Sequence, residues 1–121
     1  MDGQSVLRSK AESALRGARL LLLGRHYDSA ASRAHFAVCL AMNAALGPLP
    51  AGDRRRRHGA LLVPQNLALA GLARADGRIL NRMYVARIRA DYQIHRIGAE
   101  EAGTLLAAAS LLLARMGVVP P

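Results

Sequence analysis

Aromatic side chains are almost absent from this chain, and that shortage limits the folds open to it. Only four of the 121 residues are aromatic, three Tyr and one Phe, whereas Ala and Leu account for 24 and 20 residues. Sheets favour β-branched and aromatic side chains, and closely packed helices favour small and aliphatic ones. A chain of this length forms one domain with a single core. The sequence therefore predicts one all-α domain over residues 1–121, and it argues against a β-sandwich, a barrel or a disordered chain.

Apolar residues recur at helical spacing in four or five segments. The Pro- and Gly-containing stretch at about 47–53 is expected to be a loop, and Pro64 is expected in the first turn of a short helix or at a kink. Asp76-Gly77 is expected to mark the boundary before the next helix, and residues 118–121 to form a disordered tail. The predicted helices cover about residues 5–23, 28–46, 78–92 and 99–116, and the apolar stretch 59–73 holds a helix that starts near residue 63 or a longer, kinked one.

The formal net charge is +9, from 16 Arg and one Lys against eight acidic residues. Ten of the basic and three of the acidic residues lie between positions 51 and 96, so this part of the chain holds most of the positive charge. Arg keeps its charge and binds phosphate with a planar fork. The excess predicts a nucleic acid or another polyanion as partner. The preference for Arg over Lys has a second explanation, the composition of a GC-rich genome.

Several classes of site and location are not expected. The single cysteine, Cys39, excludes an internal disulfide and fits a reducing cytoplasm. Charged residues interrupt the start of the chain, so no signal peptide is expected, and no uncharged stretch reaches the roughly 18 residues that a membrane span needs. The glycine-rich phosphate loops are absent, and the four histidines lack the spacing of a metal site. We expect no membrane contact, no cofactor and no metal ion.

Arginine and histidine remain as the residues that can carry chemistry. A metal-free ribonuclease needs no other types, because His transfers the proton of a 2′-hydroxyl and Arg stabilises the charge that develops on the phosphate. The segment Arg87–Arg96 supplies both at the end of a predicted helix.

Three strings of the sequence resemble the small stand-alone HEPN-domain proteins. The segment Gly24–Ala37, GRHYDSAASRAHFA, resembles their Gly-x-Tyr-x-x-Ala-x-x-Arg-Ala-Tyr-Tyr-Ala helix, with His35-Phe36 in place of the Tyr pair. His58-Gly59 resembles a His-Gly element before their third helix, and Arg89-Ala90-Asp91-Tyr92 resembles Arg-x-x-Ala-Asp-Tyr near the end of their fourth. The resemblance covers about residues 8–115, and it implies an up-and-down bundle of four or five helices that forms a homodimer.

The resemblance also implies a function. HEPN domains often act as metal-independent ribonucleases, and many are toxins paired with a minimal nucleotidyltransferase antitoxin. Their active motif is Arg followed after four to six residues by His, which Arg89 and His95 match; Arg19 and His26 match too, as expected by chance in an Arg-rich chain. In this hypothesis His95 is the general base or acid, Arg89 holds the scissile phosphate, and Asp91 orients one of them. Active members commonly carry a polar residue directly after the Arg, where this chain has Ala90.

Other residues are assigned binding or structural roles. Arg33 is interpreted as a partly buried partner of Asp91, with Tyr92 also structural, and His35 and Phe36 as core or dimer-interface residues. Cys39 is interpreted as a small core residue. The run Arg54–Arg57 is either a solvated, mobile loop or a contact to RNA. The residues expected to contact RNA are Arg54, Arg55, Arg56, Arg57, Arg87 and Arg96.

Three classes of function therefore stay open. The first is a protein that binds RNA or cleaves it without a metal, such as the toxin of a toxin–antitoxin pair. The second is a non-catalytic helical interaction module that docks a nucleotidyltransferase or another acidic partner. The third is a structural bundle without a polyanion partner.

Overall fold

The computed structural model describes residues 2–49, 51–94 and 96–118, and these residues form helices and connecting segments without a strand. The all-α prediction is thus confirmed, with six helices in the described part of the chain instead of four or five. The helices are α1 (Gly3–Leu23), α2 (Tyr27–Leu46), α3 (Arg54–Leu61), α4 (Pro64–Leu69), α5 (Arg74–Tyr92) and α6 (Ala99–Arg115).

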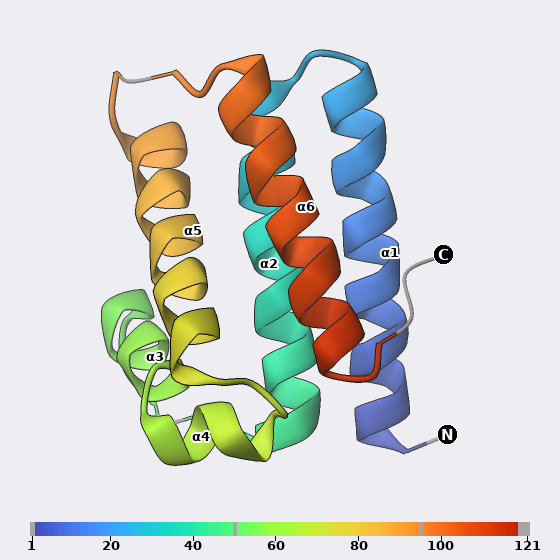
Figure 1. Ribbon diagram of the computed structural model, residues 1–121, viewed down its shortest axis with the longest axis vertical. Helices are drawn as coiled ribbons and strands as arrows, with labels where there is room; N and C mark the ends of the chain where they lie inside the picture. Colours follow the sequence, from blue (N-terminus) through green and yellow to red (C-terminus); the bar gives the residue numbers. More distant parts are fainter. Residues whose placement is uncertain (1, 50, 95, 119–121) are drawn as a thin grey trace.

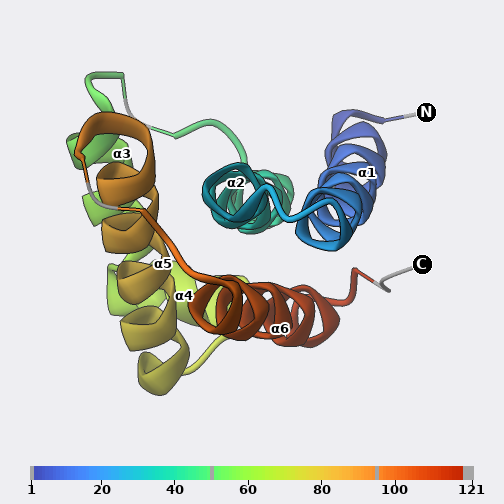
Figure 2. The same cartoon turned by 90° about the horizontal axis from the view of Figure 1, so that it is seen from above.

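The four long helices run alternately up and down, and α4 lies across the lower end of the bundle (Figure 1). Seen from above, α2 occupies the middle, with α1 on one side and α3 and α5 on the other (Figure 2). Helix α6 packs against α2 and α1. The α3–α5 side of the molecule is therefore remote from α1.

Small side chains let the central helices approach closely. Helix α1 packs along α2, and Ala11, Ala14 and Ala18 of α1 and Ala34 and Ala37 of α2 are fully buried. Large aliphatic side chains fill the remaining space, with Leu15, Leu80, Leu112 and Leu113 among the most buried. Truncating such a leucine to alanine costs about 2–5 kcal/mol of stability, because the cavity collapses only in part.

The basic run Arg54–Arg57 forms the first turn of α3, so the expectation of a mobile loop is wrong. Asp53 explains the difference: its Oδ1 accepts a hydrogen bond from the backbone N–H of Arg56 at 2.9 Å. An aspartate in this position satisfies one of the N–H groups that a helix start leaves without a partner.

Helix α5 begins at Arg74, one turn before the predicted start, so Asp76-Gly77 lies inside the helix and is not a boundary. Asp76 is buried, and its Oδ2 accepts from the backbone N–H of Ala73 at 2.8 Å while Oδ1 pairs with Arg115 of α6. A Cβ at Gly77 would lie 2.8 Å from Cδ1 of Leu67 on α4, so a larger residue here would require the Leu67 side chain to shift.

The remaining ends follow the predictions more closely. Pro64 occupies the first turn of α4, where its missing N–H removes no hydrogen bond. The predicted tail is wrong at Val118, which is buried and donates its N–H to the carbonyl of Leu113 at 2.8 Å. Residues 119–121 lie outside the described residues.

Candidate functional site

A pocket of about 290 Å³ lies between α2, α3 and α5. Its polar walls come from His35 on α2, from Arg54, Arg57 and His58 on α3, and from Arg87 on α5. We call it the α2–α3–α5 pocket; its full lining is His35, Phe36, Cys39, Asn43, Leu49, Arg54, Arg57, His58, Leu61, Tyr84 and Arg87. No carboxylate is among these described residues, so the pocket has a positive potential.

His35 is buried at the inner wall of the pocket and is electrically neutral. Burial lowers its pKa to about 3, and the guanidinium of Arg87 acts in the same direction. Nη1 of Arg87 lies 3.2 Å from Nδ1 of His35, a geometry in which the guanidinium donates and Nδ1 accepts. The prediction that His35 is a core residue agrees with this burial, and the ring also reaches the pocket.

Cys39 lies one turn further along α2, with its Sγ 3.6 Å from Nε2 of His35. Burial raises the pKa of this thiol to about 11. A thiol with such a pKa stays protonated at neutral pH and is a poor nucleophile. The interpretation of Cys39 as a packing residue is consistent with this environment.

His58 connects α3 to α5 by two contacts. Its ring stacks on Tyr84, with centroids 3.8 Å apart and planes 8° from parallel, and its Nε2 lies 3.0 Å from Oδ1 of Asn81. An amide oxygen only accepts, so Nε2 carries the proton and Nδ1 has the lone pair in the neutral ring. This Nδ1 is buried without a hydrogen-bond partner among the described residues. Burial lowers the pKa of His58, and the hydrogen bond to Asn81 opposes that effect.

Asp91 lies near the outer end of the pocket and is linked to it by Arg87, which lines the pocket and pairs with the Asp91 carboxylate. Nε of Arg87 is 3.4 Å from Oδ2 of Asp91, and the same oxygen accepts from the hydroxyl of Ser32 at 3.1 Å. The predicted pair between Arg33 and Asp91 is therefore wrong. Arg33 is exposed, and its guanidinium lies 4.8 Å from the ring centre of Phe36.

The side chain of Arg89 extends from α5 toward α6 and not toward the pocket. Its Nη2 lies 3.4 Å from Oε2 of Glu101, in the first turn of α6. Arg89 and Asp91 thus contact α6 and α2 respectively, and the structure does not bring them together. His95 lies outside the described residues. The predicted trio of Arg89, Asp91 and His95 therefore stays a hypothesis.

The other predicted residues do not gather in one site. Tyr92 is exposed and carries the guanidinium of Arg54, 4.7 Å from its ring centre and in contact with its hydroxyl. Arg55 and Arg56 are exposed on α3. Arg96 is exposed in a separate hollow beside Asp28, so it does not line the pocket.

An arginine-lined groove of about 820 Å³ adjoins the pocket. Arg74, Arg78 and Arg82 stand one turn apart on α5 and line it, together with Asn81 and part of α4. None of the three arginines forms an ion pair with a described residue, and no carboxylate of the described chain lines this groove. The hydrogen bond between Asn81 and His58 connects the arginine groove to the pocket. Sequence reasoning missed this groove, although the spacing of three arginines by four residues was visible.

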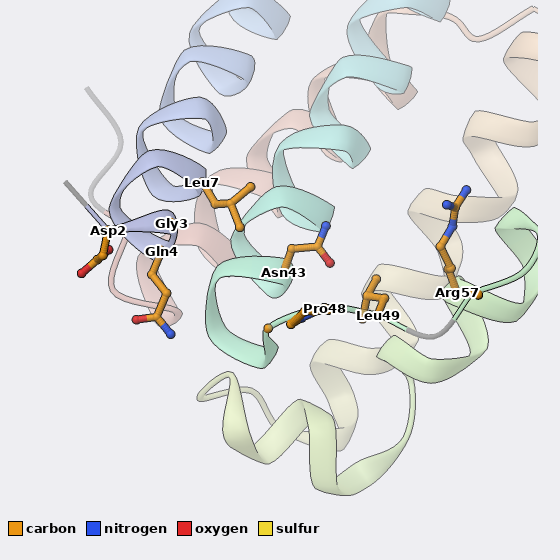
Figure 3. Close-up of a pocket in the computed structure, with 10 residues that line it drawn as sticks. Asp2, Gly3, Gln4, Leu7, Asn43, Pro48, Leu49 and Arg57 are labelled. Carbon is orange, nitrogen blue, oxygen red and sulfur yellow. The ribbon is translucent and has the colours of Figure 1, made fainter.

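A further hollow of about 680 Å³ lies between the start of α1 and the loop after α2 (Figure 3). Leu7, Pro48 and Leu49 give it an apolar character, and Asn43 and Arg57 line both this hollow and the pocket.

Within the described residues, no three His, Cys, Asp or Glu side chains are grouped as a metal site. None of the described helices has the length and apolar character that crossing a bilayer requires.

Two of the three strings that resemble the family contribute residues to the pocket. His35 comes from the first string and His58 from the second. The third string, Arg89–Tyr92, does not line the pocket, whereas Arg87, two residues before it, does. A family model described as the HEPN domain matches residues 4–118. No curated protein matches the chain.

Proposed function

Because this chain belongs to the HEPN domain family, we propose that it binds RNA through the arginine-rich side formed by α3 and α5. The observation that carries the proposal is the arginine groove with the adjoining pocket, both lined by arginine and by no carboxylate of the described residues. Like charges one turn apart on a helix cost about 0.2–0.5 kcal/mol per pair, so the stripe Arg74, Arg78 and Arg82 opposes stability. A bound phosphate backbone would offset that repulsion.

The bundle supports contact with phosphates from two helices at once. Four consecutive arginines begin α3, and Arg55, Arg56 and Arg57 among them are exposed. Few aromatic rings accompany them, and only Tyr92 is exposed on this side. Base stacking is therefore a minor contribution, and affinity should depend mostly on charge and hence on salt.

We further propose that the protein cleaves the bound RNA as a homodimer without a metal ion. In this proposal His95 takes the proton of a 2′-hydroxyl or returns one to the leaving oxygen, and Arg89 stabilises the phosphate. Asp91 influences these two residues through its charge and not by direct contact, because its carboxylate is bound by Ser32 and Arg87. To bind the phosphate, the Arg89 guanidinium would have to leave Glu101, with which it forms a partly exposed ion pair.

A second function is favoured by those same ion pairs. Arg89 and Asp91 are both engaged by structural partners, an arrangement that suits a non-catalytic module. Such a module would use the arginine-rich side to dock an acidic partner. That partner could be a nucleotidyltransferase that serves as the antitoxin. It would bind polyanions and cleave nothing.

Incubation of purified protein with a labelled RNA in excess EDTA separates the two functions. The ribonuclease proposal predicts cleavage that His95→Ala abolishes, and His26→Ala is the matched control because His26 is exposed at the start of α2. Cleavage products ending in a 2′,3′-cyclic phosphate would support the proposed proton transfer. Equal cleavage by wild type and His95→Ala would contradict it, and RNA binding without cleavage would support the second function.

A further inference from the structure

The α2–α3–α5 pocket differs from the open arginine groove in shape. Side chains of three helices and Leu49 of the connecting loop form its walls, and it encloses about 290 Å³. A continuous RNA strand fits along an open groove, whereas a pocket closed on three sides accepts a chain end or a small molecule. The volume holds a phosphate group together with part of a sugar.

Three arginines from two helices line this pocket. Arg54 and Arg57 come from α3 and Arg87 from α5, and none of the described lining residues is acidic. Asp91, which does not line the pocket, forms an ion pair with Arg87, and the guanidinium of Arg54 packs on the ring of Tyr92. Arg57 is exposed and forms no ion pair with a described residue, so it is available to a ligand.

We propose that the α2–α3–α5 pocket binds a terminal phosphate monoester, with Arg54, Arg57 and Arg87 as its charged ligands. Three positive charges suit the two negative charges of a monoester better than the single charge of a phosphodiester within a chain. The phosphate can belong to the end of an RNA or to a free mononucleotide. This inference extends the proposed RNA binding. It depends on that proposal only for the identity of the molecule that carries the phosphate, and not for the phosphate site itself.

The two histidines make the binding sensitive to pH. A dianion in the pocket would lie beside both rings, whose centroids are 6.2 Å apart, and would favour their protonated forms. His58 is the better acceptor of that proton, because Nε2 already donates to Asn81 and the buried Nδ1 has a free lone pair. The charged or titratable groups facing the rings are His35 and Cys39 on α2, Arg54 and Arg57 on α3, and Tyr84 and Arg87 on α5.

Calorimetric titration with sodium sulfate tests the pocket without RNA. Sulfate keeps its two charges between about pH 5.5 and 8, so any change of affinity over that range reports protein groups. We expect affinity to rise as the pH falls, and we expect Arg57→Gln to weaken it by about tenfold. Arg16→Gln is the matched control: it removes the same charge from an exposed position on α1 and does not line the pocket, so it should change the affinity less than about twofold.

A second measurement locates the anion even where a variant is unstable. In wild-type protein, the ring signals of His35 and His58 in a ¹³C spectrum should shift on addition of sulfate, while those of exposed His26 should not. Equal effects of Arg57→Gln and Arg16→Gln, together with unmoved His35 and His58 signals, would overturn the inference.

Comparison of two oligonucleotides links the pocket to RNA. A 5′- or 3′-phosphorylated oligonucleotide should bind at least about fivefold more tightly than its hydroxyl-ended counterpart, and adenosine monophosphate should compete for the difference. A preference for adenosine monophosphate alone would support the pocket with a free nucleotide as ligand and would count against the proposed RNA binding. Tight binding of RNA regardless of its ends, with no sulfate effect at the histidines, would support RNA binding and overturn the phosphate pocket.

Discussion

The ring of His58 stacks on the ring of Tyr84, with centroids 3.8 Å apart, and this contact holds the basic helix α3 against α5. Helix α3 has only eight residues, and just His58 and Leu61 among them are buried. So short a helix depends on tertiary contacts for its stability. The stack therefore fixes where Arg54 and Arg57 stand relative to Arg87.

Removal of the Tyr84 ring should loosen α3 more than the rest of the bundle. We expect Tyr84→Ala to lower the free energy of unfolding by about 2 kcal/mol, and to speed amide exchange in α3 selectively. Tyr84→Phe is the matched control, because it keeps the stacked ring and should cost less than about 0.5 kcal/mol. Urea unfolding and hydrogen exchange check both variants. Unchanged exchange in α3 after Tyr84→Ala would show that the stack does not hold this helix.

The buried carboxylate of Asp76 should be one of the most sensitive polar groups. It accepts the N–H of Ala73 at the start of α5 and pairs with Arg115 at the end of α6. Because its burial leaves no water to replace a lost partner, we expect Arg115→Gln and Asp76→Asn each to cost about 2–4 kcal/mol. The double variant should cost less than the sum of the two, as measured by a double-mutant cycle in urea. Full additivity would mean that the pair is not coupled.

Much of the bundle could be predicted from the sequence because helix burial is a local, periodic property. The alanine stripe on α2 and the apolar spacing of α1, α5 and α6 each identify a helix without reference to the others. The ends of α3 and α5 could not be located as well, because the decisive groups, Asp53 and Asp76, act through hydrogen bonds that composition does not reveal.

The pocket was the least predictable part. It joins His35, His58 and Arg87, which lie far apart in the sequence and meet only when α3 folds back onto α5. Arg33 and Asp91 show the opposite error: a plausible pair by residue type does not form, because Ser32 and Arg87 are nearer to the carboxylate.

His35 should make the folded state sensitive to acid. Its pKa is lowered to about 3 in the folded protein, below the ordinary value of 6.5. The unfolded chain therefore binds one more proton between these pH values, so stability is complete above about pH 6.5 and is lost as the pH falls toward 3. The slope from this one residue is at most about 1.4 kcal/mol per pH unit.

Urea unfolding between about pH 7 and 4 checks this prediction. Stability should fall with pH in the wild type, and His35→Asn should show a shallower fall whatever its stability at neutral pH. If the two proteins lose stability in parallel, His35 is not the neutral buried group that the structure describes.

The central claim is that RNA binds to the α3–α5 side, and a charge-matched pair of triple variants tests it most directly. One variant changes Arg74, Arg78 and Arg82 to Gln in the arginine groove. The other changes Arg8, Lys10 and Arg16 to Gln, which are exposed residues of α1, the helix that α2 separates from α3 and α5 (Figure 2).

Fluorescence anisotropy with a labelled single-stranded RNA, at several salt concentrations between about 50 and 300 mM, gives the affinity and its salt dependence. The account predicts that the groove variant binds at least about tenfold more weakly, with a salt slope smaller by about 2, since each lost phosphate contact removes about 0.7 from it. The α1 variant should keep the wild-type slope. Equal losses of affinity and slope in the two variants would contradict binding at this side.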